Sequence, residues 1–118
     1  MTLVDTSVWI DHFRSGNRSL AGMLEREEVL THPFVIGELA CGQLRNRDEI
    51  LELMAALPSA TMADHDDVLA LVERHRLHGR GIGWIDAHLL AAARLADASL
   101  WTLDGPLRGA ATRVGVSA

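Results

Sequence analysis

Four acidic residues stand where their carboxylates could act together. Asp5 ends one apolar run and Asp104 ends another, whereas Glu38 lies inside a helical pattern and Asp86 in the first turn of a second one. Carboxylates are the ligands that Mg²⁺ and Mn²⁺ prefer, and a cluster of them repels itself unless a divalent cation neutralises the charge. One or two such ions can activate a water, orient it towards a phosphodiester and stabilise the leaving oxygen.

Each acid also has an ordinary structural explanation. Asp5 precedes Thr-Ser and Asp104 precedes glycine, so both could belong to turns. Glu38 could be a solvated helix acid, and Asp86 could simply interact with the positive end of a helix dipole. The functional signal is therefore the joint order: a strand ending in Asp, a mid-helix Glu, a helix-start Asp and a second strand ending in Asp.

The elements that must position these acids alternate between strand and helix. Strands are predicted at 2–5, 29–31, 60–62, 99–103 and 113–116, and helices at 8–16, 20–26, 33–44, 48–57, 64–75, 84–98 and 106–111. This alternation indicates a parallel α/β sheet with right-handed crossovers. Ligands of such sheets bind beyond the carboxyl ends of the strands, where Asp5 and Asp104 are expected.

Length and composition favour one domain over residues 1–118. The chain is 48% hydrophobic and 23% charged, which excludes a disordered tail or a disulfide-stapled mini-protein. No apolar run approaches the roughly 20 residues that span a bilayer, and the N-terminus has no basic leader. With Cys41 as the single cysteine, a cytoplasmic location is expected.

The charge balance excludes several phosphate chemistries. The net charge is −5, and all 11 bases are arginines, since the chain has no lysine. A Walker-type phosphate loop, a receiver domain and a haloacid-dehalogenase-type phosphatase each need an active-site lysine. An acidic chain is also unsuited to binding nucleic acid by bulk charge, although bound cations would make the acids attractive to phosphate.

Histidine and tryptophan suggest weaker alternatives. The six histidines do not form a set with zinc-site spacing. Trp9 and Trp84 could stack on bases near the predicted site, but packing in the core or against a second copy is the favoured interpretation. Cys41 is interpreted as a packing residue, because no Cys-His-Asn arrangement supports covalent catalysis.

The chain resembles the PIN-domain nucleases, and most closely the VapC toxins of bacterial toxin–antitoxin pairs. The matching segments are VDTSVWIDHFR at 4–14, FVIGELACG at 34–42 and WIDAHLLAAARLADASLWTLDGPL at 84–107. The first and last are specific in combination, whereas 45–83 matches only in element order. One departure follows Asp104, where the family often has an aromatic residue and this chain has Gly-Pro-Leu.

The resemblance implies a three-layer α/β/α fold with a parallel sheet of four to five short strands in the order 3-2-1-4-5. It also implies an acidic catalytic pocket made by Asp5, Glu38, Asp86 and Asp104. In that pocket Asp5 and Asp86 would be the principal Mg²⁺ ligands, and Glu38 and Asp104 would assist directly or through water. Mn²⁺ is expected to substitute for Mg²⁺.

The resemblance further implies supporting residues around the pocket. Ser7 and Thr6 are expected to hydrogen-bond Asp5 or a metal-bound water, and Thr102 is expected to act similarly. Candidate RNA contacts are Arg14, Arg45 and Arg80, each of which could instead be a solvated arginine.

The expected activity is Mg²⁺-dependent hydrolysis of RNA, in a tRNA or another structured RNA, by a toxin that a VapB-type antitoxin blocks. A homodimer is also expected. The first alternative is a PIN-fold protein that binds RNA or a partner with an inactive pocket. The second is a signalling or phosphatase domain phosphorylated on Asp5, against which the absence of lysine counts.

Overall fold

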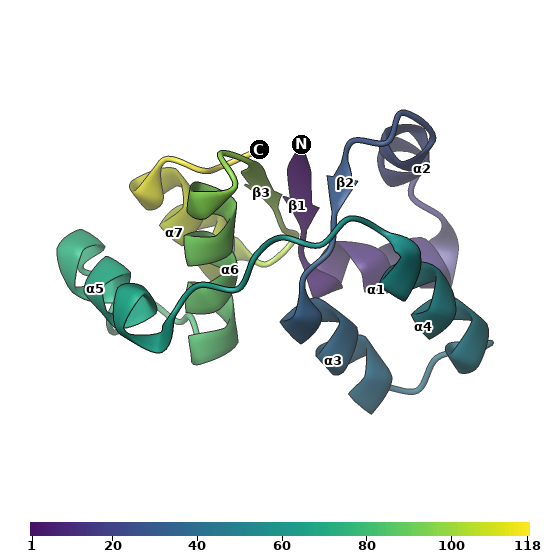
Figure 1. Ribbon diagram of the computed structural model, residues 1–118, viewed down its shortest axis with the longest axis horizontal. Coiled ribbons are helices and arrows are strands. Elements are labelled where there is room, and N and C mark those ends of the chain that lie inside the picture. Colours follow the sequence, from purple (N-terminus) through teal and green to yellow (C-terminus); the bar gives the residue numbers. More distant parts are fainter.

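A three-stranded parallel sheet lies at the centre of the molecule, in a computed structural model that describes all residues from Met1 to Ala118 (Figure 1). The strands are β1 (Thr2–Val4), β2 (Val29–Leu30) and β3 (Ser99–Trp101), and their order is β2-β1-β3. In register, Thr2 of β1 lies opposite Val29 on one side and Ser99 on the other. Because all pairs are parallel, the carboxyl ends of the strands share one edge of the sheet.

Seven helices surround this sheet, and none of them is long and apolar enough to cross a membrane. They are α1 (Thr6–Ser15), α2 (Arg18–Glu25), α3 (Pro33–Cys41), α4 (Arg47–Ala56), α5 (His65–His75), α6 (Trp84–Leu95) and α7 (Gly105–Val114). Figure 1 shows α5, α6 and α7 on one side of the sheet and α1 to α4 on the other. The predicted parallel α/β architecture is confirmed.

The sheet has three strands rather than the predicted four to five. The predicted strands at 60–62 and 113–116 do not form, and single parallel bridges lie one residue outside them, Thr31↔Ser59 and Leu100↔Ser117. The observed order β2-β1-β3 corresponds to the central 2-1-4 of the predicted order 3-2-1-4-5, and the two bridges adjoin β2 and β3.

The prediction of a terminal strand was wrong because α7 continues to Val114. The buried residues of this helix are spaced three and four apart, so they form one face that packs against the core: Leu107, Ala110, Ala111 and Val114. Gly115, with φ of 86°, then ends the helix in the left-handed conformation. Packing of that stripe outweighs the short β-branched run that follows it.

The core lies where β1 meets α6. Leu3 and Val4 of β1 are fully buried, and so are Leu89 and Leu90 of α6. Burying such aliphatic side chains contributes about 1.5–3 kcal/mol each. This contact holds the start of α6, with Asp86 in its first turn, beside the carboxyl end of β1.

Candidate active site

Asp5 stands at the junction of β1 and α1. Its backbone N–H donates to the Trp101 carbonyl at 2.9 Å, which extends the β1–β3 ladder by one residue. Its side chain then caps α1, and only 6% of the residue is exposed. An aspartate that directly follows a strand and precedes Thr-Ser therefore becomes both the end of the strand and the N-cap of the helix.

Two hydroxyl groups hold the Asp5 carboxylate through the same oxygen. Ser7 Oγ donates to Asp5 Oδ2 at 2.7 Å, and Thr102 Oγ1 donates to it at 2.8 Å. Each hydroxyl also accepts a backbone N–H after β3: Ser7 from Leu103 and Thr102 from Asp104, both at 3.0 Å. The two hydroxyls therefore tie Asp5 to the loop that carries Asp104.

Glu38 reaches the same region from α3. Its Oε1 accepts a hydrogen bond of 2.8 Å from Thr6 Oγ1, a residue 32 positions earlier in the chain. Thr6 thus contacts Glu38 rather than Asp5, its neighbour in sequence. Because Thr6 is buried and Glu38 is exposed, the hydroxyl holds one end of a carboxylate that otherwise faces solvent.

Asp86 and Asp104 each cap the first turn of a helix. Asp86 Oδ2 accepts the Gly83 N–H at 3.0 Å at the start of α6, and Asp104 Oδ2 accepts the Leu107 N–H at 3.0 Å at the start of α7. Helix N-termini favour negative charge, so both positions suit a carboxylate. Both acids therefore have a structural role at the start of a helix, and the hydrogen bonds of that role determine where their carboxylates lie.

The four acids share one pattern of hydrogen bonding. We call Asp5, Glu38, Asp86 and Asp104 the acid site. Each uses one carboxylate oxygen in hydrogen bonds within the protein and makes none through the other. The two ion pairs of the molecule, Arg26–Glu28 and Arg47–Asp48, both lie elsewhere in the chain.

Repulsion between like charges in the acid site involves Asp86, Asp5 and Asp104. Burial raises the pKa of Asp86, and the charges of Asp5 and Asp104 raise it further, against the hydrogen bond from Gly83, which lowers it. Like charges that interact in this way disfavour each other's ionised form. A cation placed among them would remove that penalty.

A family model described as PIN domain matches residues 2–111. The chain belongs to the PIN-domain family. It is 47% identical over 118 residues to proteins named Ribonuclease VapC32 from two strains of Mycobacterium tuberculosis, across 99% of this chain and 95% of theirs. These findings confirm the sequence-based identification of a VapC-type PIN-domain ribonuclease.

Two solved structures share the fold. One is FitAB bound to a DNA fragment, with a TM-score of 0.64, 19% identity and coverage of 99% of this chain and 92% of that one. The other is FitAcB from Neisseria gonorrhoeae, with a TM-score of 0.62, 19% identity and coverage of 99% and 95%. At this level of identity the likeness shows the PIN architecture alone.

PIN-domain nucleases generally depend on a divalent metal, and the donor set of the acid site fits one. The free oxygens of four carboxylates are hard ligands of the kind that Mg²⁺ and Mn²⁺ take. No three His, Cys, Asp or Glu side chains already converge on one point in this structure. A cation would therefore have to draw the carboxylates together.

The three arginines predicted to contact RNA lie in two different places. Arg14 and Arg45 line one pocket of about 660 Å³ at the far end of α1, together with Gln43 and Asn46. Arg80 lies in the loop before α6, where its Nε donates to the Arg76 carbonyl at 2.8 Å. The structure thus separates Arg80 from the other pair.

One arginine beside the acid site was not predicted from the sequence. Arg108 donates from its Nη2 to the Thr102 carbonyl at 3.3 Å and lies one turn along α7 from Asp104. Its spacing of four residues from a helix-capping aspartate is the signal that could have identified it.

Two histidines are buried at α3 and α6, the helices that carry Glu38 and Asp86. His32 caps α3 through Nδ1 and is fully buried, and His88 lies on α6 within one turn of Asp86. His32 Nε2 and His88 Nδ1 have no hydrogen-bond partner. Burial lowers the pKa of His32 to about 4, with a further contribution from His88, so the imidazole is neutral at pH 7.

Proposed function

We propose that the acid site binds Mg²⁺ and hydrolyses phosphodiester bonds of RNA, with Mn²⁺ able to take the same place. The observation that supports this is the shared hydrogen-bonding pattern, in which each of four carboxylates keeps one oxygen without a partner. In this proposal Asp5 and Asp86 are the principal ligands, and Glu38 and Asp104 assist directly or through water.

The side chains around the acids then have definite roles. When bound, a divalent cation lowers the pKa of water and stabilises the negative charge that develops on the phosphate. Ser7 and Thr102 hold the Asp5 carboxylate in one orientation, since both donate to the same oxygen. Thr6 does the same for Glu38. Such partners of metal ligands fix the geometry that catalysis needs.

The test is cleavage of total tRNA by the purified protein in Mg²⁺, in Mn²⁺ and in EDTA. Discrete fragments are expected only with metal, and they should disappear in Asp5→Asn and Asp86→Asn. Asp67→Asn is the matched control, because Asp67 is an exposed acid in the first turn of α5. Full cleavage by either acid-site variant would overturn the assignment of these residues.

A PIN-fold protein that binds RNA or a partner without cutting is the second candidate. The absence of three converging metal-ligand side chains favours it. Thermal unfolding in Mn²⁺ distinguishes the two, because a ligand at about 100 times its Kd stabilises the folded state by roughly 2.7 kcal/mol. A rise of the melting temperature that Asp5→Asn abolishes supports the nuclease, and no rise supports the binding protein.

We also propose that the chain is the toxin of a pair with a VapB-type antitoxin and that it forms a homodimer. Both partners need apolar surface, and two apolar surfaces are exposed. Leu53 of α4 is 63% exposed beside an apolar pocket of about 240 Å³ lined by Trp9 and Phe13, and Trp84 and Ile85 are exposed at the start of α6. Sedimentation at micromolar concentration tests the dimer, and a monomer would contradict it.

A further inference from the structure

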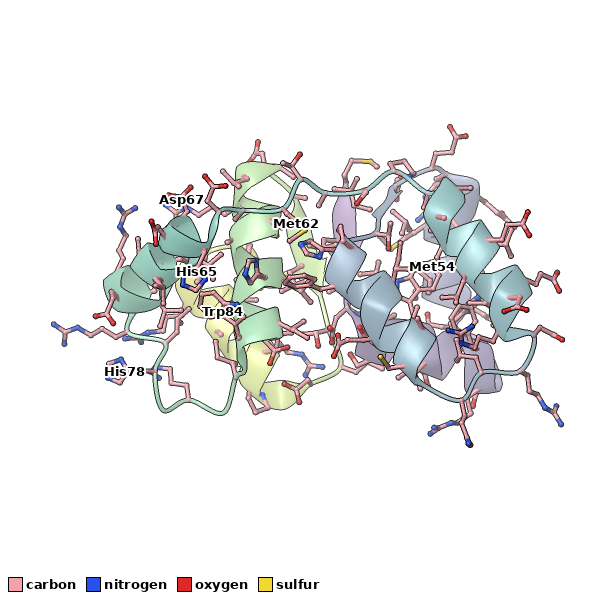
Figure 2. The ribbon with its side chains drawn as sticks, turned by 60° about the horizontal axis from the view of Figure 1, so that its bottom comes forward. Met54, Met62, His65, Asp67, His78 and Trp84 are labelled. Carbon is pink, nitrogen blue, oxygen red and sulfur yellow. The ribbon has the colours of Figure 1, made fainter.

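Five of the eleven arginines gather where the C-terminal ends of α5, α6 and α7 meet. We call them the cationic cluster, and they come from the ends of three helices and one loop: Arg74 and Arg76 at the end of α5, Arg80 in the loop that follows, Arg94 in the last turn of α6 and Arg113 in the last turn of α7. All five side chains are exposed. In Figure 2, His78 of the same loop lies below α5, at the same end of the molecule.

His75 is the point where these arginines meet. Arg94 Nη1 lies 3.0 Å from His75 Nε2, and Arg113 Nε donates to the His75 carbonyl at 2.7 Å. Arg80 Nε donates to the carbonyl of Arg76, the next residue, at 2.8 Å. Contacts between the ends of α5, α6 and α7 therefore bring together arginines that are up to 39 positions apart in the chain.

The cluster has little negative charge to balance it. Neither ion pair of the molecule involves these arginines, and Glu73 is the single acid among the residues lining the adjacent pocket of about 690 Å³. Burial lowers the pKa of His75, and the charges of Arg94, Arg74 and Arg113 lower it further. A chain of net charge −5 thus holds a positive surface in one place.

Helix dipoles account for part of this arrangement. The negative end of a helix favours a cation in its last turn, which suits Arg74, Arg94 and Arg113. The helix dipole does not explain Arg80, which lies in a loop. It favours one cation at the end of each helix, but it does not explain why five arginines lie together. Exposed arginine side chains that form no ion pair are suited to phosphate, which their planar guanidinium groups bind in a bidentate manner.

We propose that the cationic cluster binds the phosphate backbone of the RNA substrate at a distance from the bond that is cut. This inference rests on the proposed ribonuclease function and adds a second contact region to it. Asp86 and Arg94 are eight residues apart on α6, which is about 12 Å along the helix axis. Since one strand of a double helix carries a phosphate about every 3.4 Å, the cluster would meet the backbone about three to four phosphates or more from the acid site.

The decisive variant is Arg74→Gln/Arg76→Gln. Neither side chain donates a hydrogen bond within the protein, so their replacement removes charge without removing an internal contact. Circular dichroism and the melting temperature should therefore match those of the unsubstituted protein. The control is Arg18→Gln/Arg26→Gln, which changes the net charge equally at the two ends of α2, on the other side of the sheet (Figure 1). It also breaks the exposed Arg26–Glu28 ion pair, which contributes little to stability.

The primary measurement is the Kd for tRNA in EDTA at several salt concentrations, because it does not depend on cleavage. Each phosphate contact contributes about 0.7 to 0.9 to the slope of log K against log salt, so the slope should fall by about 1.4 to 1.8 in the cluster variant and stay unchanged in the control. In Mg²⁺, KM for tRNA should rise with kcat unchanged. Cleavage of a trinucleotide, which is too short to reach the cluster, should be unaffected.

The outcomes separate this inference from the function on which it rests. An unchanged slope, or an equal loss of slope in the α2 control, overturns the inference while tRNA cleavage by the unsubstituted protein still supports the nuclease. Failure of the unsubstituted protein to bind or cleave tRNA overturns both. Loss of binding to a poly-glutamate peptide with intact tRNA affinity would assign the cluster to an acidic protein partner, and it too would overturn the inference.

Discussion

Replacing Thr102 with valine removes one hydroxyl from the centre of the acid site and leaves the shape of the side chain nearly unchanged. Thr102 is only 3% exposed, donates to Asp5 Oδ2 at 2.8 Å and accepts the Asp104 N–H at 3.0 Å. A hydrogen bond to a charged group contributes about 1.5–3 kcal/mol. The Asp104 N–H also loses its partner, so we expect Thr102→Val to reduce the free energy of unfolding by about 2–3 kcal/mol.

The larger effect is expected on metal binding. With Ser7 alone on Oδ2, the Asp5 carboxylate can turn its free oxygen away from the position that the metal requires. Removing the partner of a metal ligand typically weakens metal binding about 10- to 100-fold. Thr102→Ser keeps the hydroxyl and loses one methyl group, so it should retain metal affinity at a stability cost of about 1 kcal/mol.

Urea unfolding without metal measures the first effect, and titration with Mn²⁺ measures the second. Thr112→Val is the control, because its hydroxyl bonds only to the Arg108 carbonyl on the exposed face of α7 and its loss should change stability by less than about 0.5 kcal/mol. Equal Mn²⁺ affinity in the valine and serine variants would refute the reasoning, since the hydroxyl would then not orient Asp5.

Three further predictions concern charge and backbone. Asp86→Asn should raise the melting temperature of the metal-free protein at pH 7; because the pKa of Asp86 is raised in the folded state, the difference should vanish in acid, where the unsubstituted carboxyl is protonated. Burial lowers the pKa of His32 from 6.5 to about 4, so the free energy of unfolding should fall as the pH decreases from 6.5 to 4. His32→Asn can still cap α3 and should remove that pH dependence. An unchanged pH profile of urea unfolding in this variant would contradict the prediction. Gly81→Ala should destabilise the protein by roughly 1–2 kcal/mol, since Gly81 has φ of 81° and an added Cβ would lie 3.4 Å from Pro106. Gly109 lies on α7 with open space around it, so Gly109→Ala should stabilise the protein by up to about 1 kcal/mol. A similar change in both variants, measured by urea unfolding, would count against the argument.

The parts of the fold that sequence predicted are those set by local signals. Asp5 before Thr-Ser predicted the end of a strand and the start of a helix, and Pro33 predicted the first turn of α3. The apolar stripe that begins near Trp84 predicted α6. These elements alone place Asp5 and Asp104 at one edge of a parallel sheet, so the outline of the acid site could be predicted from the sequence.

The contacts that sequence could not predict join distant parts of the chain. The family resemblance implied that Thr6 hydrogen-bonds Asp5 or a metal-bound water, yet its hydroxyl donates to Glu38 of α3. Likewise, nothing local places Arg113 against His75, which lies 38 residues earlier. Such pairs depend on how helices pack over the sheet. The end of α7 at Val114 was also not predicted, although a glycine such as Gly115 is a common signal for the end of a helix.

Helix α6 explains how an acidic chain can act on a polyanion. Asp86 lies at its first turn and Arg94 at its last, so each charge faces the helix end that favours it. In the proposed mechanism the acid site repels phosphate until a divalent cation occupies it, whereas the cationic cluster attracts phosphate at all times. RNA binding should therefore depend strongly on salt at the cluster and on metal at the acid site. A net charge of −5 then favours binding of RNA at these two regions, because the rest of the surface repels phosphate.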